Sequence, residues 1–163
     1  MTVFSPPKHR AGLAWLGTRH RAIVAQAFRY LGAVAVLATG VAHIEQYAVA
    51  DYSAVPTIGT LFLLNFIAAI VIAVGLIAPL GRVAGRYADG VRAVFAVGGI
   101  GLSVLSLVAL FVSESSGLFG WVENGYRMAI VVAIAAEFAA TVFLVAFLLA
   151  NGTGLQRVRT SSR

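Results

Sequence analysis

The amino-acid sequence predicts an all-α membrane protein, a bundle of four transmembrane helices with both termini in the cytoplasm. Of the 163 residues, 60% are hydrophobic and 11% are charged, whereas soluble domains have about 25% charged residues. Four apolar runs are each long enough to cross a bilayer, which takes about 20 residues. The basic residues gather at alternate ends of these runs, which is typical of membrane proteins.

The four runs lie at residues 30–50, 57–79, 91–112 and 127–150. They are expected to be helices, because a helix satisfies every backbone amide within its own segment. Pro56 precedes the second run and Pro79 closes it, and helices tolerate proline at both positions. Residues 1–29 form a basic tail, either an amphipathic helix along the membrane or a solvated leader. Residues 151–163 form a second basic tail.

The basic residues predict the direction of the spans. One lysine and four arginines precede the first span, three arginines flank the loop after the second, and three follow the fourth. The other two loops contain one basic residue, so both termini are expected in the cytoplasm. This distribution, with a net charge of +6, does not indicate a nucleic-acid-binding protein. Aromatic anchors at the outer interface are expected to be Tyr47, Tyr52, Trp121 and Tyr126.

A cleaved signal peptide is the alternative interpretation of the first run. The triplet Ala-Val-Ala at 48–50 has the small residues of a signal-peptidase site, and it follows an apolar core with basic residues before it. Cleavage after Ala50 would leave three spans that begin at Asp51. The long leader and the polar His43 and Glu45 near the site favour an uncleaved first span.

His43, Asn65 and Glu137 lie deep inside three of the predicted spans, where such polar groups are costly and often functional. At about 1.5 Å per residue, His43 lies about 10 Å, Asn65 about 12 Å and Glu137 about 15 Å from the outer ends of their spans. They belong to three different spans and lie at similar depth. A helical bundle is therefore expected to bring them together.

Small residues predict the helix faces that pack, because they let backbones approach closely in a membrane. The expected packing residues are Gly40, Gly99, Ser103, Ser106, Ala133 and Ala140. From these faces we expect a compact bundle with a polar pocket that opens to the outside. His43 would lie deep in it, while Glu45, Gln46 and Tyr47 would form its wall and its hydrated rim.

The sequence leaves the roles of the pocket residues open. Glu137 is either a proton carrier, a cation ligand or a headgroup partner, or a paired carboxyl group that joins helices. His43 is either a proton relay or a residue hydrogen-bonded within the bundle, and Asn65 is expected to join helices. No metal site is predicted, because zinc needs three or four good ligands. No cofactor is predicted, and a quinone or a lipid is left open as a ligand. The absence of cysteine excludes thiolate chemistry.

His43 with Tyr47 four residues later, and the segment PTIGTLFLLN from Pro56 to Asn65, resemble a pattern in small uncharacterised four-span membrane proteins of actinobacteria. The resemblance covers residues 39–66 and the four-span layout. It implies this fold in a bacterial plasma membrane and carries over no catalytic residue. A weaker resemblance is to the DoxX-like four-span proteins, some of which are linked to quinone-dependent oxidation.

Three functions are expected, in this order. The first is an accessory or assembly subunit of a membrane complex, because the chain is small, has short loops and lacks a catalytic set. The second is a small binding or transport protein for a proton, a cation or a polar headgroup. The third is a DoxX-like oxidoreductase subunit that contacts quinone. The expected partners are the lipid bilayer and either another membrane protein or a second copy of the chain.

Overall fold

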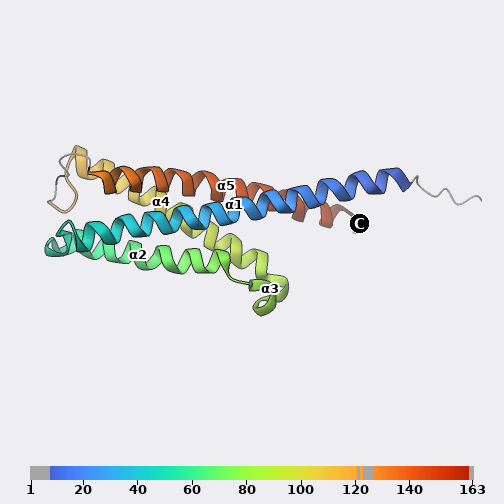
Figure 1. The fold of residues 1–163 in the computed structure, drawn as a ribbon, viewed down its shortest axis with the longest axis horizontal. Helices are drawn as coiled ribbons and strands as arrows, with labels where there is room; N and C mark the ends of the chain where they lie inside the picture. The colour runs from blue at the N-terminus through green and yellow to red at the C-terminus, as the bar shows by residue number, and fades with distance from the viewer. Residues whose placement is uncertain (1–7, 121, 123–126, 162–163) are drawn as a thin grey trace, which may run out of the picture.

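The computed structural model describes residues 8–120, 122 and 127–161, with side chains for 19–120, 122 and 127–152. Figure 1 shows long helices arranged along one axis. In chain order the elements are α1 (Lys8–Ala48), η1 (Tyr52–Ala54), α2 (Pro56–Ile77), α3 (Leu80–Val83), η2 (Gly85–Tyr87), α4 (Ala88–Ser115) and α5 (Met128–Ser161). The described residues form no strand, which confirms the all-α prediction.

Four helices are long and apolar enough to cross a membrane, as the sequence predicts. Their apolar segments are Arg19–Ala48, Pro56–Ile77, Gly85–Ser115 and Met128–Gly152. The differences from the predicted runs lie at the ends, because hydropathy marks the apolar centre of a helix and not its last hydrogen-bonded turn.

The first helix extends well beyond its apolar segment. The sequence predicts a basic tail over residues 1–29, whereas α1 already begins at Lys8. Between Lys8 and the apolar segment the chain contains Gly12 and Gly17 but no proline, so no residue there forces the helix to end. Figure 1 shows this part of α1 projecting past the rest of the bundle in line with the helix.

Helix α1 is central to the packing, and it contacts α2 on one side and α5 on the other. At Gly40, an added Cβ atom would lie 2.8 Å from the Cβ atom of Ala69, so only glycine permits this approach of α1 to α2. At Gly99, it would lie 2.6 Å from Leu144 Cδ1 and 3.3 Å from Val36 Cγ2. These close contacts hold α4 against both α5 and α1.

The remaining residues predicted to pack the helices divide into two groups. Ser103 and Ala140 are fully buried between helices, at 0% exposure. Ser106 and Ala133 are only partly buried and line a cavity instead.

Helices α2 and α4 are close at one end and separate at the other. Near α3, a Cβ atom at Gly75 would clash with the ring of Phe95, and Gly98 faces Ile72 at ordinary contact distance. Figure 1 shows α4 leaving α2 at this end and crossing toward α5. Because the two helices diverge, their far halves leave space between them.

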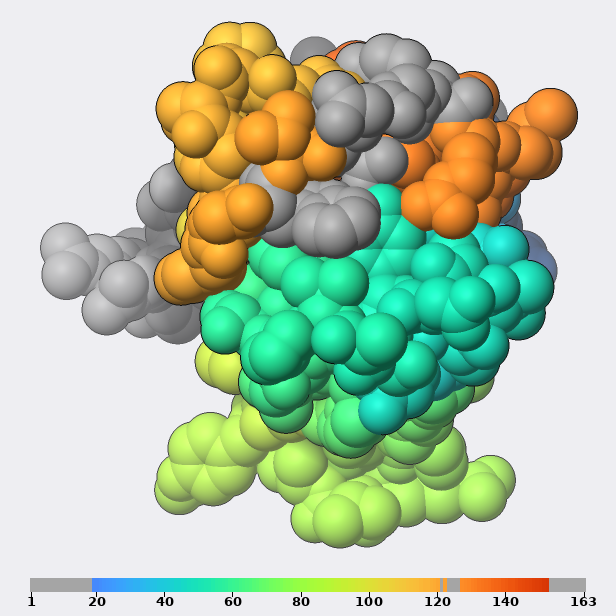
Figure 2. All heavy atoms as spheres, turned by 90° about the vertical axis from the view of Figure 1, so that its left-hand side faces the viewer, coloured from blue at the N-terminus to red at the C-terminus, as the bar shows by residue number. Residues whose placement is uncertain are grey.

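The α1–α2 connection closes the other end of the bundle, which Figure 2 shows end-on. Helix α1 ends before Asp51, whose φ of 61° is a left-handed conformation that aspartate adopts more readily than most residues. Tyr52 follows, and its backbone carbonyl lies against Gly59, where no Cβ atom would fit. This contact directs the Tyr52 side chain inward, where it is 3% exposed. The prediction of Tyr52 as an interfacial anchor is therefore wrong, while Trp121 and Tyr126 lie outside the described residues.

Candidate functional site

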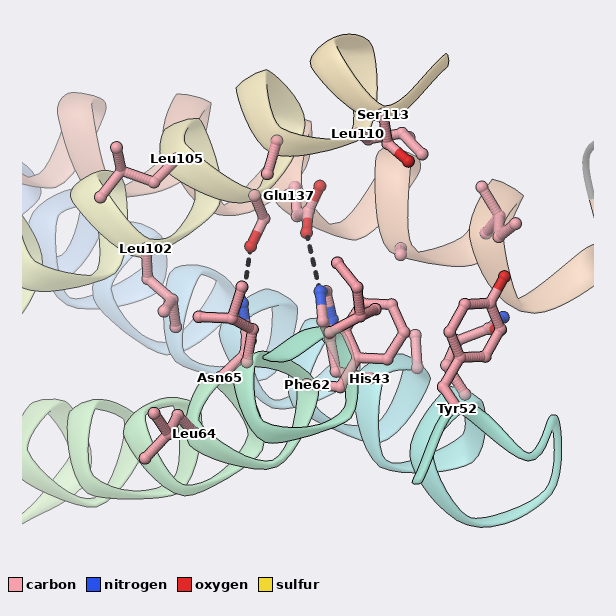
Figure 3. A pocket seen from close by; sticks show the side chains of 18 of the residues that line it. His43, Tyr52, Phe62, Leu64, Asn65, Leu102, Leu105, Leu110, Ser113 and Glu137 are labelled. Atoms are coloured by element: carbon pink, nitrogen blue, oxygen red, sulfur yellow. Dashed lines mark hydrogen bonds and ion pairs between the residues drawn. The ribbon is translucent and has the colours of Figure 1, made fainter. Parts of the chain in front are cut away.

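A cavity of about 420 Å³ occupies the space between the diverging halves of α2 and α4. Its inner wall comes from α1 and α5, so all four long helices contribute (Figure 3). Thirteen of the twenty lining residues are Ala, Leu, Ile or Phe, so it is a mostly apolar cleft and not the polar pocket that the sequence predicts. Its polar residues come from all four long helices and from the α1–α2 connection: His43, Gln46, Tyr52, Asn65, Ser106, Ser113 and Glu137.

The cavity reaches the side of the bundle, because some of its lining side chains are exposed. Leu64 on α2 is 54% exposed and Leu105 on α4 is 70% exposed. Figure 3 shows these leucines on opposite helices. The cleft therefore has an opening between α2 and α4 that is bordered by apolar side chains.

His43 and Glu137 face one another across the inner wall, from α1 and α5. His43 Nε2 lies 3.8 Å from Glu137 Oε1, which is within ion-pair range but longer than a hydrogen bond. His43 is 9% exposed and Glu137 is 2% exposed. The opposite ring nitrogen, Nδ1, lies 2.9 Å from the Thr39 carbonyl oxygen and donates its proton there. In a neutral ring this leaves the Nε2 lone pair directed toward Glu137 and the cavity.

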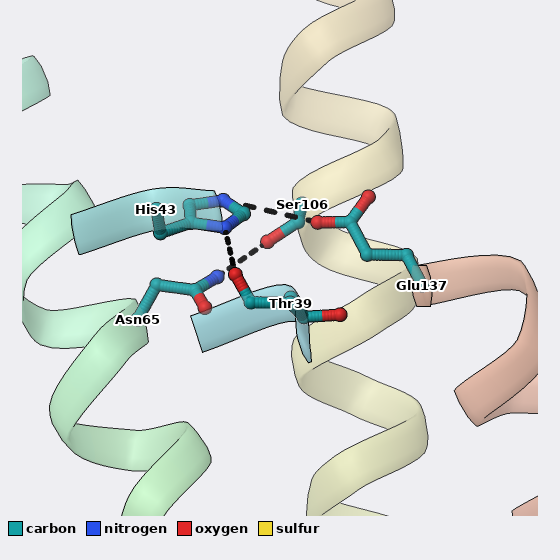
Figure 4. A network of polar contacts seen from close by, with 5 residues as sticks. All are labelled: Thr39, His43, Asn65, Ser106 and Glu137. Carbon is teal, nitrogen blue, oxygen red and sulfur yellow. Dashed lines mark hydrogen bonds and ion pairs between the residues drawn. The ribbon is translucent and has the colours of Figure 1, made fainter. Parts of the chain in front are cut away.

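A second polar contact joins α2 to α4 beside this pair (Figure 4). The Asn65 side-chain amide donates a hydrogen bond of 2.6 Å to Ser106 Oγ. The Ser106 hydroxyl group also interacts with the Glu137 carboxyl group, so the two contacts form one network. Thr39, His43, Asn65, Ser106 and Glu137 thus connect all four long helices at one level of the bundle.

Several buried polar atoms around the cavity have no hydrogen-bond partner within the described chain. They include both polar atoms of the Gln46 amide, Asn65 Oδ1 and Glu137 Oε1. About one helical turn farther from the α1–α2 connection, the hydroxyl oxygens of Thr39 and Ser103 also lack a hydrogen-bond partner within the described chain. A buried polar atom without a partner costs about 1–3 kcal/mol, so most such atoms in proteins are satisfied. Their concentration beside a cavity indicates a place where a ligand could supply the missing partners.

Aromatic side chains close the cavity at the end next to the α1–α2 connection. The Phe62 ring packs edge-on against the His43 ring, with 5.3 Å between centroids, and lies 5.1 Å from the Tyr52 ring. The Arg127 guanidinium group, at the start of α5, donates a 2.9 Å hydrogen bond to the Tyr52 hydroxyl oxygen. The loop residue Tyr52 thereby ties the start of α5 to the connection between α1 and α2.

The structure brings His43, Asn65 and Glu137 together, which the sequence analysis expected from their depth. Glu45 and Tyr47 do not line the cavity. Glu45 is two positions after His43 and therefore lies on another side of α1, whereas Tyr47, four positions after His43, lies on the same side one turn beyond the cavity lining. Gln46 is 5% exposed, so the prediction that it lies in a hydrated rim is wrong.

Three polar or aromatic residues of the cavity were not predicted to lie there: Tyr52, Phe62 and Ser113. Gln46 lies in the cavity wall as predicted, because it is three residues after His43 and shares one helix face with it. The position of Tyr52 depends on the path of the loop, which helix periodicity does not define.

The chemistry available at this site is hydrogen bonding to a polar group at the inner end of an apolar cleft. No three His, Asp or Glu side chains gather closely enough to hold a metal ion anywhere in the part of the chain that the structure describes. Comparison of the sequence with protein-family models and with curated proteins, and of the fold with solved structures, finds no match.

Proposed function

We propose that this chain is a bacterial plasma-membrane protein that binds an amphipathic, lipid-soluble small molecule in the cavity between α2 and α4. The four apolar helices would cross the bilayer, and the positive-inside rule would place both termini in the cytoplasm. The observation that carries the proposal is the cavity itself, which joins a buried polar cluster to an apolar opening on the side of the bundle.

The geometry suits a ligand that arrives from the bilayer. Exposed Leu64 and Leu105 border the opening, so an apolar ligand could pass between α2 and α4 without entering water. Its polar head would then reach Gln46, Asn65 and Glu137, whose side chains have buried atoms without a hydrogen-bond partner. A volume of about 420 Å³ lies in the range of about 300–1,000 Å³ that is usual for small-molecule sites.

The expected alternatives relate to this proposal in different ways. A quinone is lipid-soluble and has a polar head, as the proposed ligand must. A DoxX-like redox function would add electron transfer to the binding of such a ligand. An accessory subunit without a ligand would not need unpaired polar atoms beside a cavity, so the cavity favours binding.

The test is purification of the full chain in a gentle detergent, followed by mass spectrometry of the organic extract and of co-eluting proteins. We expect a lipid-soluble molecule in a fixed ratio to the protein. Leu105→Trp should exclude it by filling the opening, and Glu137→Gln should lower its occupancy by altering the polar end. Val108→Trp is the matched control, because Val108 is a similarly exposed residue of α4 that does not line the cavity.

Two outcomes would overturn the proposal. One is a wild-type chain that carries no small molecule but elutes with a protein in fixed ratio, which supports the accessory-subunit alternative. The other is a bound molecule whose occupancy is equal in Leu105→Trp and Val108→Trp, because the ligand would then lie outside the cavity.

A further inference from the structure

A second charged feature lies at the opposite end of the bundle, away from the cavity. The buried face of α1 follows an alternating spacing of four and three residues, which is the packing seam of a helix in a bundle. The seam residues are Ala25, Arg29, Gly32, Val36, Thr39, His43 and Gln46. Arg29 is thus an arginine at a seam position, and it is only 9% exposed.

Helix α4 has an equivalent seam. Its inward-facing residues are Arg92, Ala96, Gly99, Ser103 and Ser106. Helices α1 and α4 run in the same direction, and they touch where Val36 faces Gly99. Arg29 precedes Val36 by seven residues, and Arg92 precedes Gly99 by seven residues. Seven residues are two helical turns, about 10 Å, so both arginines lie on the contact side at the same level.

The positive charge at this level is only partly balanced. Arg92 forms an ion pair of 3.0 Å with Asp89, whose side chain is 57% exposed. Within the described residues, no other carboxylate forms an ion pair with Arg29 or Arg92. The Nε atoms of both arginines are buried and have no hydrogen-bond partner in the described chain. Asp89 therefore pairs with only one of the two guanidinium groups, and each group keeps an Nε donor without a partner.

The surroundings of the pair are those of a membrane interface. The Arg29 guanidinium carbon lies 4.7 Å from the centre of the Tyr30 ring, and Tyr30 is 41% exposed. Leu31 and Val34, on the next turn toward the bilayer centre, are also exposed. Arg29 precedes Ala48 by 19 residues, about 28 Å of helix, which is close to the thickness of the hydrocarbon core.

We propose that Arg29 and Arg92 bind the phosphate group of an anionic phospholipid from the cytoplasmic leaflet. A guanidinium group binds phosphate through two parallel hydrogen bonds, which matches the unpaired donors. Basic pockets between helices at the cytoplasmic side are suited to anionic headgroups. The acyl chains would lie against exposed Leu31 and Val34. This inference rests on the membrane orientation proposed above, but it does not depend on any ligand in the cavity.

The test uses the full chain in a neutral detergent and measures its thermal unfolding while phosphatidylglycerol, phosphatidylcholine or inorganic phosphate is added. We expect phosphatidylglycerol alone to raise the unfolding temperature. Arg29→Gln with Arg92→Gln should weaken this binding about tenfold or more for each lost guanidinium contact. Arg82→Gln with Arg86→Gln is the matched control, because it removes the same charge from exposed arginines near α3.

Several results would overturn the inference. They are an equal effect of phosphatidylcholine, an equal loss of binding in the control pair, or a full effect of inorganic phosphate, which would indicate a site for a soluble anion. If the glutamine variants do not fold, Arg29→Lys with Arg92→Lys keeps the charge, and native mass spectrometry should show fewer bound lipids than in wild type. Equal lipid counts would then contradict the inference. Glu137→Gln should keep phosphatidylglycerol binding, so failure of this site and failure of the cavity site are distinguishable.

Discussion

The substitution Gly99→Ala tests the contact that holds α4 to the rest of the bundle. A Cβ atom at residue 99 would lie 2.6 Å from Leu144 Cδ1. Leu144 is 0% exposed, and its other methyl group already lies against Gly32. Rotation of the leucine away from residue 99 would therefore move it into α1. Because the side chain has no free direction, α4 and α5 must separate instead.

The expected magnitude comes from a comparison with Gly101→Ala in the same helix. A Cβ atom at residue 101 meets nothing within 4 Å. In both variants alanine gains about 1 kcal/mol of helix propensity over glycine, and this gain cancels in the comparison. What remains is the overpacking at residue 99, which costs about 1–3 kcal/mol. Gly101→Ala should thus be neutral or stabilising, and Gly99→Ala should be less stable than it by about 1–3 kcal/mol.

The assay is reversible unfolding in mixed detergent micelles, with the free energy of unfolding measured for wild type and both variants. Far-ultraviolet circular dichroism checks that each variant keeps its helices before unfolding. Equal free energies for Gly99→Ala and Gly101→Ala would refute the reasoning, since that result would mean that α4 does not pack tightly on Leu144.

Two further contacts make quantitative predictions. A double-mutant cycle between Asn65→Ala and Ser106→Ala should give a coupling free energy of about 0.6–1.7 kcal/mol for the α2–α4 hydrogen bond, and a coupling of zero would show that the bond does not form. Tyr52→Phe removes the acceptor of the Arg127 hydrogen bond and should lower the free energy of unfolding by about 1 kcal/mol. Tyr87→Phe, which removes an exposed hydroxyl group that pairs with Arg86, should change it much less, and equal losses would contradict the buried role of Tyr52.

The sequence was sufficient to predict the properties that depend on position along a helix. The four apolar helices follow from hydropathy, because each must be apolar over a fixed length. The shared depth of His43, Asn65 and Glu137 follows from counting residues at a constant rise per residue. These residues lie on three helices and line one cavity because their depths match and their faces turn inward.

Properties that depend on how helices tilt and which path the loops take could not be predicted from the sequence. The cavity exists because α4 leaves α2 and crosses to α5, and no local pattern gives a crossing angle. Tyr52 is an aromatic residue of the type that anchors at membrane interfaces, but the loop contact at Gly59 turns its side chain inward. The expected hydrated rim at Gln46 was wrong for a related reason. The residue lies near the end of α1, but it faces the neighbouring helices.

The order of layers along the packing seam favours binding over transport through the bundle. The polar layer at the cavity ends with Thr39 on α1 and Ser103 on α4, and the arginine layer begins at Arg29 and Arg92. Between them, the described seam residues are apolar or glycine: Gly32, Val36, Ala96, Gly99, Ala140 and Leu144. These residues make the tightest contacts between α1, α4 and α5, with no space for a Cβ atom at Gly32 or Gly99.

An ion or proton passing through the bundle would need polar groups or water across this layer. The packing leaves no space for water there, because Leu144 fills the distance between the two glycines. The same layer separates the cavity from the arginine pair, so in the proposed membrane orientation each site would face its own side of the bilayer. A transport function would therefore require Leu144 to move out of the seam. Such a movement would separate α5 from both α1 and α4, the two helices that it holds together.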